Sequence, residues 1–211
     1  MKFLSLDGLK VFYKSLLEKI DKKITNKIDE IEIGGQNLID GTQEFVITNA
    51  DSFQLCNSHI MSNESYKGLT VRGNESLWNF YRFYITLEPG TYTFSAYAKG
   101  NTPRIQKWLG DTNGTCYYTE VYTGITTEWK RISMTFTLPV KVSVSPRFES
   151  ADKGSDASDT SYILYLCGYK LERGPYATDW TPSVNDQIST ISKLSSRIEA
   201  LEGKATSTET E

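Results

Sequence analysis

The sequence is poor in the residues on which metal sites, disulfide scaffolds and most acid–base catalysis depend. It has three cysteines, Cys56, Cys116 and Cys167, which are far apart and form no Cys-x-x-Cys pair, and one histidine, His59. Three separated cysteines argue against a disulfide framework or a zinc site and are typical of reduced thiols. A single histidine leaves little basis for a His-based metal site or triad. We therefore expect no metal and no cofactor.

Long hydrophobic runs and a charge of one sign are also missing. No apolar run approaches the roughly 18–20 residues that span a bilayer, so membrane insertion is not expected. Residues 1–6 are too short, before Asp7, to resemble a secretory signal. Lys and Arg number 23 against 26 Asp and Glu, for a net charge of −3. This balance gives no electrostatic basis for binding nucleic acid or anionic lipid and is typical of a soluble protein.

Aromatic residues are what the sequence has in abundance. They make up 12% of the 211 residues, with 13 Tyr, 9 Phe and 4 Trp. Tyr, Phe and Trp favour β-strands, and rings that point outward from a sheet can form a stacking surface. The composition therefore favours a β-rich protein whose outward rings form a binding face.

Residues 36–182 show the alternation expected of many short strands. In "NFYRFYITLEPG" every second residue is apolar up to a Pro-Gly turn, and "GTYTFSAYAKG" and "EWKRISMTFTLP" repeat the pattern. "SYILYLCGYKLE" is apolar on both faces, which is typical of a central strand covered on both sides. Short strands at near-regular spacing predict a mainly β sandwich or barrel, and 147 residues are enough for its core.

The segment before this domain has a helical period. Apolar residues recur with an average step of 3.6 over residues 7–33, and Gly34-Gly35 is a suitable helix end. We predict an N-terminal assembly or attachment helix within residues 1–35. Its stripe includes Leu17, Ile20, Ile24, Ile28 and Ile31.

The segment after the domain has a heptad period. Residues 183–203 place Val184, Ile191 and Ile198 at one heptad position and Leu194 and Leu201, with Gln187, at the partner position. We predict a coiled-coil helix that Gly203 ends, followed by a disordered polar tail over residues 204–211. A lone helix of this length can also pack on its own domain. Stripes at both ends of the chain favour self-association instead.

The junction "LERGPYATDWTPS", residues 171–183, joins the last strand to the last helix. Pro182 disfavours helical backbone at Thr181, so residues 179–181 should be extended, and Ser183 is a plausible N-cap. Trp180 can bury a large apolar area between the sandwich and the top of a helix bundle. We interpret the segment as a collar, with a simple strand-end turn around a core Trp as the alternative.

Four segments together resemble a known family. "GGQNLIDGT", "LEPGTYTFSAYAKG", "TEWKRISMTFTL" and "YKLERGPYATDWTPS" resemble carbohydrate-binding-module-like jelly-roll head domains of tailed-phage fibre, baseplate and head-fibre proteins, over residues 34–183. "FLSLDGLKVFYKSLLEKIDKKI" is similar to their leading helix, although here Gly8 directly follows Asp7.

The resemblance implies a virion structural protein on the exposed surface of a phage particle. It implies a jelly roll that faces host glycans, an N-terminal helix that binds other virion proteins, and a homotrimer. The heptads by themselves favour two parallel strands, so a dimer stays open. Head and tail locations are equally open.

Glycan contact requires outward aromatic rings next to polar or charged side chains. Tyr84 and Tyr97 point outward if Phe83 and Phe94 point inward, and Trp129 is assigned to the core. The alternative for each ring is a structural role that covers a second sheet. The candidates are Trp78, Arg82, Tyr84, Tyr97, Trp108, Tyr118 and Tyr122.

Catalysis and calcium binding have weaker support. Asp152, Asp156 and Asp159 lie in a Gly/Ser-rich loop, but their spacing matches no EF-hand, and a solvated loop is the better interpretation. No pair of carboxylates can be assigned to facing positions, as a glycosidase needs. We expect a binding protein and not an enzyme. A decoration protein that binds no glycan and a glycan-degrading tail enzyme are the rival hypotheses.

Overall fold

The computed structural model describes residues 12–20, 35–54, 59–74, 81–151 and 162–208. The chain divides into two compact units, Met1–Ile33 and Gly34–Glu211. In the first unit, residues 12–20 are helical, and the side chains of Leu17 and Ile20 are exposed. Ile24, Ile28 and Ile31, the rest of the predicted stripe, lie outside the described residues.

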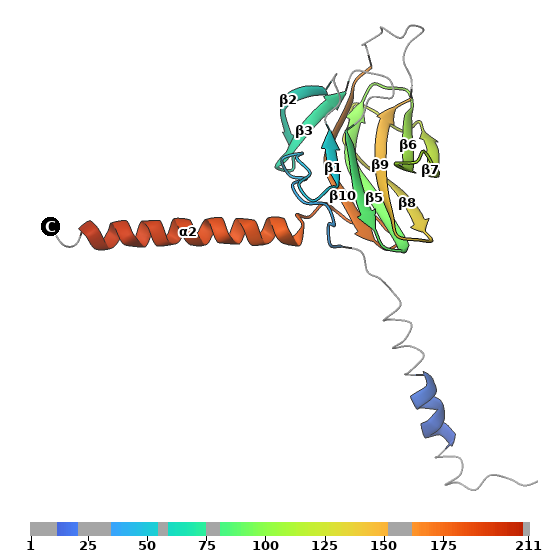
Figure 1. Cartoon of the computed structure of the whole chain (residues 1–211), viewed down its shortest axis with the longest axis horizontal. Coiled ribbons are helices and arrows are strands. Elements are labelled where there is room, and N and C mark those ends of the chain that lie inside the picture. The colour runs from blue at the N-terminus through green and yellow to red at the C-terminus, as the bar shows by residue number, and fades with distance from the viewer. Residues whose placement is uncertain (1–11, 21–34, 55–58, 75–80, 152–161, 209–211) are drawn as a thin grey trace, which may run out of the picture. The chain divides into compact units, whose positions relative to one another are not determined.

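The second unit contains two five-stranded antiparallel sheets that face each other as a sandwich (Figure 1). The first sheet has the order β1-β4-β9-β6-β7 and the second sheet the order β2-β3-β10-β5-β8. The strands are β1 Ser52–Gln54, β2 His59–Tyr66, β3 Leu69–Asn74, β4 Arg82–Leu87, β5 Gly90–Gly100, β6 Ile105–Asp111, β7 Cys116–Tyr122, β8 Lys130–Leu138, β9 Val142–Ser150 and β10 Leu164–Arg173. The predicted mainly β sandwich is confirmed.

The core lies between the sheets and follows the predicted alternation. Phe94 of the second sheet contacts Phe83 and Phe148 of the first, with ring centroids 5.9 and 4.9 Å apart. β10 is the middle strand of its sheet, as its two apolar faces predict. At roughly 25 cal/mol per Å² of apolar surface, burial of these large rings is the main favourable contribution to folding. Every second residue of the strands is therefore committed to the core, and its neighbours form the outer faces.

A strap, residues 174–183, crosses the outer face of the second sheet. The hydroxyl of Thr93 donates to the Gly174 carbonyl at 2.8 Å, and Arg131 donates to the Thr178 carbonyl at 3.3 Å. Trp180 packs in a small apolar cluster on this outer face, and its indole N–H donates to Thr42 at 3.0 Å. The backbone of residues 179–181 is neither helix nor strand. Trp180 therefore fixes the strap to the sandwich itself.

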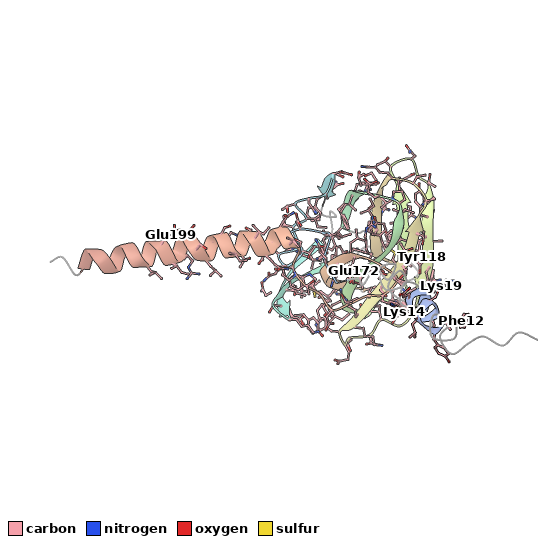
Figure 2. The ribbon with its side chains drawn as sticks, turned by 90° about the horizontal axis from the view of Figure 1, so that it is seen from below. Phe12, Lys14, Lys19, Tyr118, Glu172 and Glu199 are labelled. Atoms are coloured by element: carbon pink, nitrogen blue, oxygen red, sulfur yellow. The ribbon has the colours of Figure 1, made fainter. Side chains whose placement is uncertain are left out.

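Helix α2, Val184–Thr208, starts where the strap ends. Ser183 caps it, since its hydroxyl accepts the amide N–H of Asp186 at 3.0 Å, as the sequence predicts. The Asp186 carboxylate accepts the amide N–H of Gly41 at 2.9 Å, which ties the first turn to the sandwich. Glu199 lies farther along this helix, outside the sandwich that contains Glu172 (Figure 2).

Two predictions about this end of the chain are wrong. The helix does not stop at Gly203, and residues 204–208 are helical and not a disordered tail. A glycine inside a helix costs only about 1 kcal/mol relative to alanine, and Leu201, Lys204 and Ala205 around it are good helix formers. No helix of the described part of the chain is long and apolar enough to cross a membrane.

The apolar stripe of α2 is open to solvent in this single chain. Its side chains are between 45% and 64% exposed. They are Val184, Ile188, Ile191, Leu194, Ile198 and Leu201. The helix does not pack its stripe on its own domain, and the coiled coil stays a prediction.

Candidate functional site

The outer face of the first sheet gathers three of the predicted glycan-contact residues. Arg82 and Tyr84 alternate with buried Phe83 and Ile85 on β4, so they point away from the core. We call this surface the first face and define it by Arg82, Tyr84, Trp108, Arg147 and Glu149. The last three come from the neighbouring strands β6 and β9, where Trp108 is paired directly with Arg147.

Trp108 lies flat over its own strand. A Cβ on Gly110 would come within 1.8 Å of the indole ring, so the ring occupies the space above that glycine. The Arg147 guanidinium lies 3.9 Å from the centroid of the Trp108 ring, a cation–π contact. The ring is half-buried. Gly110 and Arg147 therefore hold the indole in one orientation on the first face.

Glu149 is the most unusual group on the first face. Its side chain points outward, yet the residue is only 5% exposed. Among the described residues, no group donates a hydrogen bond to its Oε2. Burial raises the pKa of Glu149 to about 7, against the lowering effect of Arg147 and Arg82. A buried acceptor without a donor is costly, and a ligand hydroxyl can supply that donor.

The arginine beside Glu149 is constrained as well. Burial lowers the pKa of Arg147, while the charge of Glu149 and a hydrogen bond to Tyr84 act in the opposite direction. Gln106, the outward neighbour on β6, donates to Thr119 Oγ1 at 2.5 Å. The first face thus combines rings, a carboxylate and guanidinium groups on rigid strands. That combination can stack on the C–H face of a sugar ring and hydrogen-bond its hydroxyls.

Arg147 and Glu149 were missed by sequence reasoning. The signal was present in β9, where Ser143, Ser145, Arg147 and Glu149 alternate with apolar residues in "VSVSPRFES". Their position next to Trp108 depends on the sheet order, in which β9 lies between β4 and β6. Local alternation cannot supply that order, because it is set by pairing between distant segments.

Tyr118 and Tyr122 do not belong to the first face. They share the inner side of β7, and both rings pack against the main core. The Tyr118 hydroxyl donates to Glu120, which also forms an ion pair with Lys107 at 3.0 Å. Burial and the bond to Glu120 raise the pKa of Tyr118 to about 12. These tyrosines therefore lie on the inner side of an edge strand and do not point outward, as glycan contact was expected to require.

Tyr97 points outward but on the opposite side of the sandwich. It lies on the outer face of the second sheet, is 4% exposed, and donates its hydroxyl to Asp179 of the strap at 3.0 Å. Trp129, which was assigned to the core, packs against the buried residues of this outer cluster and not between the sheets. The fold therefore separates Tyr97 from Tyr84, and the two cannot contact one ligand face.

Other predicted residues fall outside the described part of the chain. They are Trp78 and the acidic loop residues Asp152, Asp156 and Asp159. Within the described ranges, no group of three His, Cys, Asp or Glu side chains could hold a metal ion. Cys167 is buried, and burial raises the pKa of its thiol to about 12, which makes it an unreactive thiol.

Comparison with known families supports a binding role for this fold. The model of a family described as a carbohydrate binding domain matches residues 35–159, more than half of the chain. The matched segment contains β1 to β9 and hence the whole first face. A domain of this kind is a binding module that is not catalytic by itself. No curated protein sequence matches the chain.

Solved carbohydrate-binding modules are similar at low identity. A xylan-binding domain, CBM22-1 of Paenibacillus barcinonensis Xyn10C, is 12% identical with a TM-score of 0.44, and the match covers 69% of this chain and 99% of that one. A CBM4 structure is 20% identical with a TM-score of 0.41, covering 52% and 74%. TmCBM61 in complex with β-1,4-galactotriose is 15% identical with a TM-score of 0.40, covering 66% and 100%.

Proposed function

Because the chain belongs to the carbohydrate binding domain family, we propose that it is a glycan-binding protein whose first face holds the sugar. The observation that carries this proposal is the arrangement of Trp108, Arg147 and Glu149. The half-buried indole and the Arg147 guanidinium against it supply a contact surface, and the buried Glu149 carboxylate has an acceptor oxygen that no described residue satisfies. Tyr84 and Arg82 extend the same surface.

The proposed mechanism is recognition without chemistry. A sugar ring stacks on Trp108, one of its hydroxyls donates to Glu149, and the arginines donate to ring or hydroxyl oxygens. The contact removes apolar surface of both rings from water, which contributes roughly 25 cal/mol per Å² buried. A single shallow face of this kind binds weakly. Avidity then depends on how many copies of the face are presented together.

A binding assay with matched variants tests this function. Isothermal titration of the full chain with cello-, xylo- and β-1,4-galacto-oligosaccharides measures affinity for wild type, Trp108→Ala and Tyr176→Ala. Tyr176 is a matched control because it is an aromatic residue of the strap that is 79% exposed and distant in sequence from the first face. We expect at least about tenfold weaker binding for Trp108→Ala and no change for Tyr176→Ala. Equal affinities for wild type and Trp108→Ala would overturn the first face as the site.

The biological setting that we propose is the exposed surface of a phage virion. Two observations support it: the resemblance of residues 34–183 to phage head domains, and the exposed stripe of α2. In this proposal the chain is a fibre or spike subunit that self-associates as a trimer, and the N-terminal helix binds other virion proteins. It acts by attachment, without an enzymatic step. Light scattering tests it, since the fibre requires a mass of three times 23.9 kDa.

A purely structural role is the alternative, favoured by Tyr97. This predicted ligand residue is only 4% exposed, and its hydroxyl is bonded to Asp179 of the strap. A decoration protein would bind none of the oligosaccharides above while still assembling. The titration and the mass measurement therefore separate attachment from decoration.

A further inference from the structure

The outer face of the second sheet carries a row of aromatic side chains. The Tyr66 ring lies 5.2 Å from the Tyr97 ring and is stacked on Trp129 at 4.7 Å with an interplanar angle of 20°. The Lys99 ammonium continues the row, 5.0 Å from the Trp129 ring centroid and 5.6 Å from that of Tyr165. We call these residues the aromatic row. It lies on the opposite side of the sandwich from the first face.

A cavity opens at each end of the aromatic row. One, of about 290 Å³, is lined by Lys99, Tyr165, Asn101 and Thr127 among others. The other, of about 360 Å³, is lined by Lys67, Tyr97, Asp179 and Trp180 among others. Ligand pockets usually measure about 300–1,000 Å³, so both cavities are at the small end of that range, which favours a small group such as a sugar ring over a large cofactor.

The two lysines along the aromatic row lie next to acidic side chains. Lys99 forms an ion pair with Glu64 at 2.7 Å, and the Trp129 indole N–H donates to the same carboxylate at 3.2 Å. At the other end, Lys67 donates to the Tyr97 hydroxyl at 3.1 Å and lies 4.0 Å from the Asp179 carboxylate. Lys67 and Lys99 thus each have an acidic neighbour. Both ends offer hydrogen-bond donors and acceptors without a net charge, which favours a neutral ligand over an anionic one.

Most of these rings stay partly accessible. Tyr66, Trp129, Tyr165 and Trp180 are half-buried, while Tyr97 beneath them is buried. A row of partly exposed rings between two polar-rimmed cavities matches the chemistry of a sugar chain, whose rings present C–H faces and whose hydroxyls need donors and acceptors. The strap contributes two residues of one cavity, so this surface exists only when the strap is in place.

We propose that the aromatic row is a second carbohydrate-binding surface, which takes a neutral oligosaccharide whose two ends occupy the two cavities. The inference shares its ligand class with the proposed function but uses none of the first-face residues. The domain then contacts glycans on both sides of the sandwich. A single chain can bridge two glycan strands.

The test separates the two surfaces by variants of the full chain. In the double variant Tyr84→Ala/Trp108→Ala the first face is disabled, and titration with cellotetraose, xylotetraose and β-1,4-galactotetraose measures what remains. We expect residual binding to at least one tetrasaccharide, and about a tenfold loss when Trp129→Ala is added. Tyr176→Ala in the same background should leave residual binding unchanged. The matching methyl glycosides should bind at least about tenfold more weakly than the tetrasaccharide, because each fills one cavity only.

Three results would overturn the second surface. The first is a double variant that binds none of the tetrasaccharides while wild type binds. The second is residual binding that Trp129→Ala leaves unchanged. The third is equal affinity for a methyl glycoside and its tetrasaccharide. If Trp129→Ala does not fold, Thr127→Arg replaces it, since Thr127 is an exposed loop residue that lines one cavity. Failure of the first face has a different signature, namely wild type and Trp108→Ala binding alike.

Discussion

The ammonium of Lys170 lies 3.5 Å from the carboxylate of Glu172, and neither side chain is exposed to solvent at all. Both residues point outward from β10 and are sealed by the strap. Lys170 donates to the hydroxyl of Thr178 and to the Asp179 carbonyl, at 2.5 and 2.8 Å. Glu172 accepts the amide N–H of Thr178 at 2.8 Å. The pair is therefore satisfied only while the strap is docked.

Removing one partner of this pair should destabilise the domain strongly. Glu172→Gln leaves the Lys170 ammonium buried without a counter-charge, which costs about 3–5 kcal/mol when a buried pair is broken. The measurement is urea unfolding followed by tryptophan fluorescence, with the exposed Glu128→Gln as the control. A loss below about 1 kcal/mol would mean that the strap opens and admits water at little cost.

Glu149 should make stability depend on pH near neutrality. Its pKa is raised from 4.5 to about 7, so the folded protein binds more protons than the unfolded chain between these values. The contribution of this group is fully present below about pH 4.5 and is lost as the pH rises through 7. Glu149→Gln removes the effect, and should stabilise the protein at pH 8 by on the order of 3 kcal/mol.

The comparison that checks this is the difference in unfolding free energy between wild type and Glu149→Gln at pH 5 and pH 8. The gain should be much smaller at pH 5, because the wild-type carboxyl is then mostly protonated. Glu128→Gln is again the control, as an exposed glutamate. A gain of equal size at both pH values would show that packing, and not ionisation, is responsible.

Gly110→Ala should weaken glycan binding without touching any polar group of the first face. The new methyl group would lie 1.8 Å from the Trp108 ring, so the indole must leave its position. Overpacking of this kind costs about 1–3 kcal/mol. Titration with the same oligosaccharides, together with a change in tryptophan emission, checks the displacement. The control is Val140→Ala, which alters an exposed loop residue. Gly114→Ala is not used as a control because Gly114 has φ +85°, a backbone conformation that favours glycine. Unchanged affinity in Gly110→Ala would contradict a role for the fixed indole.

Polar replacement of the α2 stripe should dissociate the assembly and leave the sandwich folded. Ile191 and Ile198 are 63% and 55% exposed in the single chain, so Ile191→Gln/Ile198→Gln removes no contact within it. We expect the solution mass to fall to that of one chain, while the near-UV circular dichroism of the sandwich is retained. Ser192→Gln/Ser196→Gln, on another side of the helix, is the matched control. A solution mass that is unchanged in Ile191→Gln/Ile198→Gln would show that the stripe has a different partner.

The core was readable from the sequence because it depends on local alternation. The residues around Phe83 and Phe94 lie inward at the predicted period, and Ser183 caps the helix as its side chain and position predict. Only part of the first face could be predicted from the sequence. Trp108 and Tyr84 were identified as outward rings, but their grouping with Arg147 and Glu149 follows from strand order, which is set by long-range pairing.

The residues buried under the strap could not be predicted from local alternation. Lys170 and Glu172 look like ordinary surface charges on an alternating strand, and only the fold of the following segment buries them. Likewise, nothing local distinguishes the outward Tyr97 from Tyr84, although the two lie on opposite sides of the sandwich. Which outer face a residue occupies depends on which sheet its strand joins, and periodicity carries no information about that choice.

The place where the chain enters the sandwich is also the place where it leaves. Asn37 is bridged to Ser183 in parallel, and its side-chain amide donates to the Tyr169 carbonyl of the last strand at 3.2 Å. The two ends of the domain are thus already joined, and closing them into a host loop adds little chain entropy. The sandwich can therefore be inserted into another protein as one unit. Residues 35–183 could be spliced into a surface turn of an unrelated scaffold, carrying the strands of the first face along without disturbing the path of the recipient chain.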